Sequence, residues 1–412
     1  MIDGKSSLTP DRVRREAVKR RRQQVRRQRR ILGVVVLVVL LGVAGGFTIL
    51  PRLLHAQVPA PKQSARQPES QPRSAEPTAT SGPPPTPASP SPTYTLTLDV
   101  SENPQASVTP ASLAVAADKQ PVKLPYASWE GKRFVGWFTG PADDKNATCI
   151  DNSTLDLIPT DANTTLYARF EKAPQGVDRK TPGLPVLMYH DFYDPDQGEK
   201  AGKNEPANHL NIKTFRTQLA WLKDNHYYFP DWNEVLAFVQ GKIRLPAKSV
   251  VLTSDDGAPG FFRLAIPAVK QSQAYMTGFI IGSYAQSDKI DFSQYDPTYV
   301  AFGSHSYNLH VGNAKGDGAI TTATNDQITQ DVEREAQVIG PNFVFCYPFG
   351  RTGRDYTMRV EKDLIADGYQ LAFTVTQGRV YPGMNPMELP RLRVSEPCSA
   401  AAFHSLVHVS AP

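Results

Sequence analysis

The chain has 412 residues, of which 40% are apolar and 21% charged, a balance that excludes a wholly disordered chain and a multi-span membrane protein. Its 36 prolines are too many for regular helices and sheets, so a long linker is expected. The net charge of +5 arises at one end: residues 1–30 carry 12 Lys/Arg against 3 Asp/Glu, so the remainder is acidic.

The N-terminal part of the chain predicts a single-pass membrane anchor. Residues 31–50 carry no charge, and a helix of that length spans about 30 Å of hydrocarbon. The positive-inside rule places the basic tail 1–30 in the cytoplasm and the rest of the chain outside the cell membrane. A cleaved signal peptide is the alternative, supported by small residues near Ala44 and Ala56. Because this topology accounts for the basic charge, nucleic acid is not predicted as a partner.

A linker and a small β-rich module are expected next. Residues 51–93 hold 12 prolines with many Ser, Thr and Ala, which predicts an extended spacer. Residues 94–173 alternate apolar and polar positions in YTLTLDV, KRFVGWFTG and TTLYARFEK, which predicts a small all-β unit. Its aromatic motif around Phe134 and Trp137 resembles the Listeria-Bacteroides surface repeat. That resemblance implies a contact with the cell wall or cell surface.

Residues 180–412 have the pattern of an α/β domain, in which short apolar runs alternate with amphipathic helical stretches. Strands are expected at 185–189, 249–254, 277–281, 299–303, 343–347 and 370–376. Three helices are expected around Phe215, Leu219 and Leu222, around Ile328, Val332 and Ile339, and around Tyr356, Val360 and Leu364. The predicted fold is a distorted (β/α) barrel.

Three cysteines occur, Cys149, Cys346 and Cys398, and none has the C-x-x-C spacing of a cysteine zinc site. A single bridge between Cys346 and Cys398 stays open, because sequence alone cannot bring two Cα atoms within bridging distance.

Polar residues follow several of the expected strands. Because the carboxyl ends of barrel strands open on one face, these residues should meet in one cleft. In chain order they are His190, Asp255, Asp256, His305, His310 and the run Tyr347, Pro348, Phe349 and Gly350.

Three of these residues, Asp256, His305 and His310, form a chemically sensible metal set. Two imidazoles and one carboxylate leave coordination positions open, as a catalytic divalent ion requires. Zinc is expected first, with cobalt, nickel, iron or manganese as alternatives. The five-residue spacing of the histidines predicts a loop rather than a helix face. Asp255 is then free to act as a general base.

These residues resemble the polysaccharide deacetylases of carbohydrate esterase family 4, and in particular the branch that acts on poly-β-1,6-N-acetylglucosamine. The resemblance rests on MYH at 188–190, TSDD at 253–256, SHSYNLH at 304–310 and YPFG at 347–350. It implies a metal-dependent release of acetate from an extracellular N-acetylglucosamine polymer. Asp255 would be the base, His190 the general acid, and the segment 347–350 would contact substrate and oxyanion.

Two departures from the family pattern stand out. Ser254 replaces the usual Phe before the aspartates, and Cys346 stands close to the third motif, where many relatives have an arginine that holds the base. That role could pass to Arg391 or Arg393, although a surface salt bridge explains either arginine equally well.

Two alternatives to the β-1,6 polymer reading remain. Peptidoglycan or a chitooligosaccharide would suit an enzyme on a spacer that crosses a cell wall. A catalytically silent glycan-binding or adhesion protein is the alternative from another class, with Ser254 as a sign of decay. The complete set of Asp255, Asp256, His305 and His310 argues against decay.

Overall fold

The structure is a computed structural model that describes residues 93–117, 123–159, 161–203, 205–312, 318–350 and 354–408, without the side chains of 354–358. The predicted tail 1–30, the predicted anchor 31–50 and all but the last residue of the predicted linker 51–93 lie outside these ranges. Within them, no helix is both long enough and apolar enough to cross a membrane.

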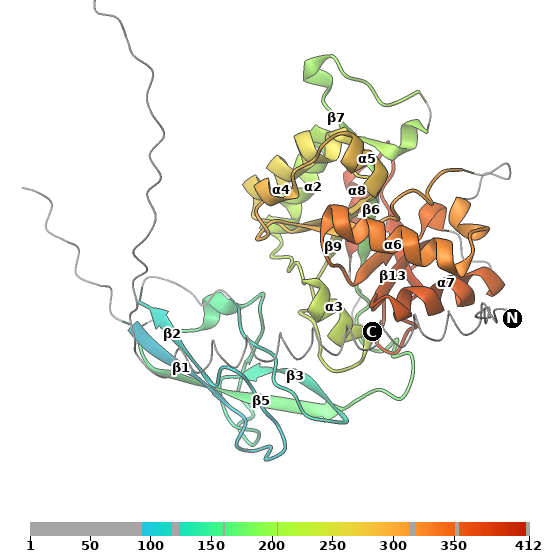
Figure 1. Cartoon of the computed structure of the whole chain (residues 1–412). Coiled ribbons are helices and arrows are strands. Elements are labelled where there is room, and N and C mark those ends of the chain that lie inside the picture. The colour runs from blue at the N-terminus through green and yellow to red at the C-terminus, as the bar shows by residue number, and fades with distance from the viewer. Residues whose placement is uncertain are drawn as a thin grey trace, which may run out of the picture. The chain divides into compact units, whose positions relative to one another are not determined.

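The first described segment forms a five-stranded sheet in the order β2-β1-β5-β3-β4 (Figure 1). The β1 and β5 strands run parallel and the other neighbours run antiparallel. The strands are β1 (Thr93–Asp99), β2 (Ser112–Ala116), β3 (Lys132–Phe138), β4 (Cys149–Ile150) and β5 (Thr164–Lys172). Alternate residues such as Leu96, Leu98 and Leu166 are buried, as expected when one face of a sheet covers a core.

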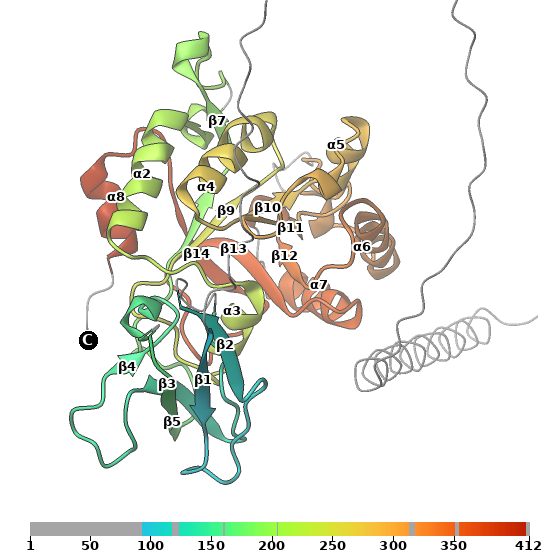
Figure 2. The same ribbon diagram turned by 90° about the vertical axis from the view of Figure 1, so that its left-hand side faces the viewer.

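The second segment is a closed barrel of seven parallel strands, ringed by helices (Figure 2), which agrees with the predicted distorted (β/α) barrel. The strands are β6 (Val186–Tyr189), β9 (Val251–Ser254), β10 (Met276–Ile280), β11 (Val300–Ser304), β12 (Val344–Cys346), β13 (Leu371–Gln377) and β14 (Leu389–Arg393). The helices are α2 (Ile212–Asp224), α3 (Trp232–Val239), α4 (Ile266–Ser272), α5 (Gly282–Ser287), α6 (Asn325–Ile339), α7 (Arg354–Ala366) and α8 (Ala400–Val407). Two short strands, β7 (Asp191–Tyr193) and β8 (His209–Asn211), pair outside the barrel.

Local sequence signals explain these elements. Every residue of β6, β9 and β10 is buried, which is why these strands are mostly apolar and lack an alternation of apolar and polar residues. The helix α6 begins with a capping box, in which Thr324 and Gln327 satisfy each other's backbone N–H groups, and it ends at Gly340.

The small sheet and the barrel share one hydrophobic core. Phe134 and Trp137 of β3 belong to the same buried cluster as Phe238 of α3. The backbone N–H of Phe134 donates to the carbonyl of Lys242 at 2.8 Å, and that of Arg244 donates to the carbonyl of Phe134 at 2.9 Å. The sheet is therefore joined to the barrel by backbone pairing as well as by apolar contact.

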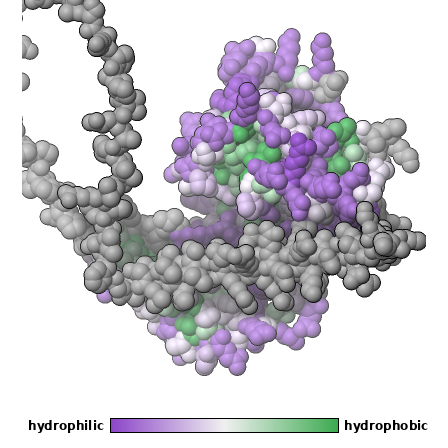
Figure 3. All heavy atoms as spheres, in the orientation of Figure 1, coloured by the Kyte–Doolittle hydropathy of each residue, from purple (hydrophilic) through white to green (hydrophobic). Residues whose placement is uncertain are grey.

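The side chains of Trp221 and Trp232 pack against other rings of the barrel domain. Trp232 stacks obliquely on Phe279 and Phe373 inside the barrel and donates from Nε1 to Thr277 Oγ1 at 3.0 Å. Trp221 stacks on His404 of α8 with ring centroids 4.1 Å apart. The outer surface seen in Figure 3 is mostly hydrophilic, with hydrophobic residues in small separate patches.

The side chain of Arg133 links β3 to the segment that leads into the barrel. Its guanidinium contacts Glu171 Oε1 at 2.6 Å and Asp178 Oδ2 at 2.8 Å. We expect Arg133→Met to lower the free energy of unfolding by about 2 kcal/mol, below the full cost of breaking a buried pair, since both carboxylates keep some solvent contact. Urea unfolding measures the change, and exposed Lys172→Met is the control that should stay within about 0.5 kcal/mol of the parent.

Candidate active site

The structure brings the predicted site residues together at the carboxyl ends of the barrel strands. His190 follows β6, Asp255 and Asp256 follow β9, and His305 follows β11. The run that starts at Tyr347 follows β12. Since β6 pairs with β9, and β11 pairs with β12, the four strand ends open on one face.

Asp256, His305 and His310 form a compact ligand set. Asp256 Oδ1 lies 3.4 Å from His305 Nε2 and 3.3 Å from His310 Nε2. All three ligand atoms lie within 4.8 Å of one another. His305 Nδ1 lies 2.8 Å from the carbonyl oxygen of Cys346, and a hydrogen bond there directs Nε2 toward Asp256. Two imidazole nitrogens and one carboxylate oxygen that converge in this way fit one divalent cation.

The electrostatics of the two histidines differ. Burial, and then the charge of His305, lowers the pKa of His310 to about 4, so its imidazole is neutral and ready to act as a ligand. Burial opposes the charge on His305 as well, but Cys346 and Asp256 outweigh it and hold its pKa well above the usual value. A cation that takes His305 Nε2 must therefore displace a proton.

Arg391 holds Asp255 in a buried, two-point ion pair. Arg391 Nη1 donates to Asp255 Oδ1 and Nη2 donates to Oδ2, each at 2.7 Å. Burial alone would raise the pKa of Asp255, but the guanidinium outweighs burial and keeps that pKa well below its usual range. Asp255 is thus ionised at neutral pH. Of the two predicted arginines, only Arg391 contacts the base, because Arg393 reaches Asn208 instead.

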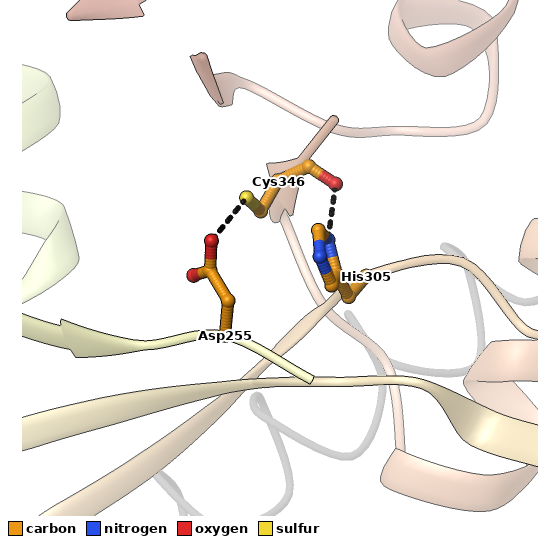
Figure 4. Close-up of side chains that lie close together, drawn as sticks. All are labelled: Asp255, His305 and Cys346. Carbon is orange, nitrogen blue, oxygen red and sulfur yellow. Dashed lines mark hydrogen bonds between the residues drawn. The ribbon is translucent and has the colours of Figure 1, made fainter. Parts of the chain in front are cut away.

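Cys346 is a site residue whose contacts the sequence did not indicate. Figure 4 shows its thiol pointing toward Asp255 and its carbonyl toward His305. The thiol lies 3.6 Å from Asp255 Oδ2 and accepts from Arg391 Nη2 at 3.1 Å. Cys346 is a free, buried thiol, and Cys398 is free as well, so the structure contains no bridge between them.

A second group of metal-ligating types, Asp255, His305 and Cys346, also lies within coordination reach. The guanidinium of Arg391 already donates to both oxygens of Asp255 and to the sulfur of Cys346. A cation there would face a fixed positive charge. The donor set around Asp256 is therefore the better metal site.

Ser254, which stands where the family usually has Phe, is fully buried and makes a hydrogen bond through its side chain. Its hydroxyl donates to the carbonyl of His190 at 2.5 Å, and the N–H of Asp255 donates to the carbonyl of Tyr189 at 3.0 Å. The two bonds fix the end of β6 against the end of β9. Burial lowers the pKa of His190, while Asp255 and Asp256 oppose that shift, so its imidazole is neutral at rest.

The segment 347–350 places a strained turn beside the metal set. Phe349 has a left-handed backbone with φ 57° and is 39% exposed. Its ring stacks on His310 with centroids 4.5 Å apart. A Cβ at Gly350, where φ is 60°, would come within 2.3 Å of Val375 Cγ1, so glycine is required there.

Part of the barrel domain matches a known protein family. The model of the polysaccharide deacetylase family matches residues 242–371, which include Asp255, Asp256, His305 and His310. The chain carries a polysaccharide deacetylase domain. Members of this family are hydrolases that act on N-acetyl groups. The family match stops short of His190 and Arg391, so their membership of the deacetylase site rests on the contacts described above.

Similar proteins carry related names. YxkH of Bacillus subtilis, named as a polysaccharide deacetylase, is 24% identical over 232 residues, which cover 55% of this chain and 77% of that protein. The poly-β-1,6-N-acetyl-D-glucosamine N-deacetylase of Escherichia coli K12 is 24% identical over 186 residues, which cover 40% of this chain and 25% of that protein. The solved structure of the deacetylase PplD of Streptococcus pyogenes is 23% identical, covers 55% of this chain and all of its own, and superposes with a TM-score of 0.45.

Proposed function

We propose that the chain is a metal-dependent deacetylase that removes N-acetyl groups from an extracellular N-acetylglucosamine polymer. The observation that carries the proposal is the meeting of two groups at the carboxyl ends of the barrel strands. One is a ligand set of one aspartate and two histidines, and the other is an adjacent carboxylate that Arg391 keeps ionised.

The residues divide the hydrolysis between them. A divalent cation, zinc first, held by Asp256, His305 and His310 would supply the Lewis acidity that polarises the acetamide carbonyl. Asp255 takes a proton from the attacking water. His190, which is neutral at rest, first takes up a proton and then gives it to the leaving nitrogen as the C–N bond breaks. A backbone N–H near Phe349 would stabilise the oxyanion. Water and amide are consumed, and acetate and a glucosamine unit are formed.

The substrate and the location rest on the sequence. The histidine motif 304–310 resembles the β-1,6 branch, and the relative from Escherichia coli carries the name of that activity. The charge-free run 31–50 and the linker 51–93 would hold the domain outside the cell membrane. Peptidoglycan and chitooligosaccharides are the competing substrates, and the β module would contact the cell surface.

Acetate release by the full chain tests the proposal. N-acetylglucosamine oligomers of β-1,6 and β-1,4 linkage are compared before chelation, after chelation, and after zinc or cobalt is restored. We expect release from the β-1,6 oligomers, its loss on chelation and its return with the metal. Asp256→Ala should bind no metal and release no acetate. Silence on both linkages from a chain that binds one metal ion would favour the glycan-binding reading, and release from β-1,4 oligomers alone would overturn the branch assignment.

A further inference from the structure

The loop between the two predicted histidine ligands has an unusual backbone. Ser306 is fully buried and has φ 68°, a left-handed conformation that a non-glycine residue adopts only when its surroundings impose it. A residue of this kind turns successive N–H groups toward the same side of the chain, which forms a concave site for an anion.

A carboxylate of the chain itself fills that concavity. Asp331 of α6 accepts from the N–H of Tyr307 at 2.7 Å through Oδ1 and from the N–H of Asn308 at 2.8 Å through Oδ2. Burial raises the pKa of Asp331, and the N–H groups of Asn308, Tyr307 and Leu309 oppose that rise. Hydrogen bonds from backbone N–H groups to a carboxylate are stronger than bonds between neutral groups, so two of them can hold a strained turn.

Other contacts complete the enclosure of the loop. The guanidinium of Arg334, also on α6, lies 3.9 Å from the ring centre of Tyr307. The carbonyl of Tyr307 accepts from the N–H of Ser283 at 2.8 Å, and that of Ser306 accepts from the N–H of Gly282 at 3.2 Å. Backbone N–H groups at the start of α5 thus donate to the carbonyl groups of the loop, while the carboxylate of Asp331 accepts from the N–H groups of the loop.

We propose that Asp331 is a positioning residue that presets His305 and His310 for the metal, so that metal affinity is controlled from α6. The inference rests on the proposed metal site and deepens it. Asp331 is not one of the three proposed ligands. Its hydrogen bonds go to the backbone of the loop and not to the side chain of either histidine. Its effect passes through the backbone between them, because fixing residues 307 and 308 fixes the separation and direction of the two imidazoles.

Two readouts test the role in the full chain. The first is the zinc dissociation constant, measured by competition with a chelator. Asp331→Asn keeps one acceptor oxygen and the side-chain volume, and we expect about 10- to 100-fold weaker binding, the usual cost of losing an outer partner of a ligand. The second is amide hydrogen exchange of residues 306–309 in the metal-free chain, which should accelerate in the variant and needs neither metal nor turnover.

Matched variants separate positioning from general stability. Asp326→Asn makes the same change at an exposed acid in the first turn of the same helix and should leave both readouts at the parent values. Asp331→Glu, which restores the charge, should recover part of the affinity. Parent-like affinity and exchange in Asp331→Asn would overturn the proposal, as would faster exchange spread evenly over the barrel. If the parent chain itself binds no zinc, the proposed metal site is wrong. Hydrogen exchange of the loop would then still show whether Asp331 holds the loop in place.

Discussion

Asp255→Asn should abolish most acetate release while leaving the metal in place. The amide has the shape of the carboxylate but cannot take a proton from water, and the loss of a general base costs about 100- to 10,000-fold in rate. The three metal ligands are untouched by the change, so metal content should remain that of the parent. Rate and metal stoichiometry, measured on the same preparation, test both parts.

The neighbouring aspartate provides the contrasting variant. Asp256→Asn should lose the metal and the rate together, whereas Asp255→Asn should lose the rate alone. A full rate in Asp255→Asn would refute the base role. Loss of metal from that variant would mean that Asp255 is itself a ligand, as its closeness to His305 and Cys346 would then explain.

The sequence predicts the parts of this site that follow from simple geometry. Asp255 and His305 each come directly after a parallel strand, and Asp256 follows Asp255. Parallel strands of a barrel must present their carboxyl ends on one face. The five-residue spacing of His305 and His310 likewise predicts a loop, and the structure places no helix there. These conclusions need only strand order and direction.

The partner of the base could not be chosen in the same way. Arg391 and Arg393 lie two residues apart on β14, and a period of two assigns them to the same side of the strand. Arg391 is buried level with Asp255, whereas Arg393 is exposed where the strand ends. The two arginines differ in how far they lie from the open end of the barrel. That position depends on the strand register, which the sequence does not show. The β14 strand itself, LPRLR, was missed because a proline and two arginines hide its apolar pattern.

The contact of Asp331 with the histidine loop was missed for a related reason. The residue lies on the face of α6 that also carries Ile328 and Val332, and all three are buried. A sequence pattern shows an acid on an apolar face, but it does not show the backbone N–H groups that the acid meets. Those groups come from a loop more than twenty residues earlier in the chain.

The second large effect is expected from Arg391→Met. The change leaves the charge of Asp255 buried without its partner, and breaking such a pair costs about 3–5 kcal/mol of unfolding free energy. With the guanidinium gone, less opposes the effect of burial, so the pKa of Asp255 rises and a smaller fraction of the base is ionised. The parent gains stability from this ionised aspartate above its unfolded pKa of about 4. It loses that stability only as the pH falls through the lower folded pKa.

The variant should therefore show a rate that climbs as the pH is raised through the neutral range, where the parent rate is independent of Asp255. Arg393→Met, two residues away and exposed, is the matched control and should keep the parent stability and an ionised Asp255. Arg391→Lys should recover little, because a single ammonium cannot donate to both oxygens of Asp255 as the planar guanidinium does. If Arg391→Met and Arg393→Met lower the rate equally, the base is held by the general field of the strand and not by the paired contacts at 2.7 Å.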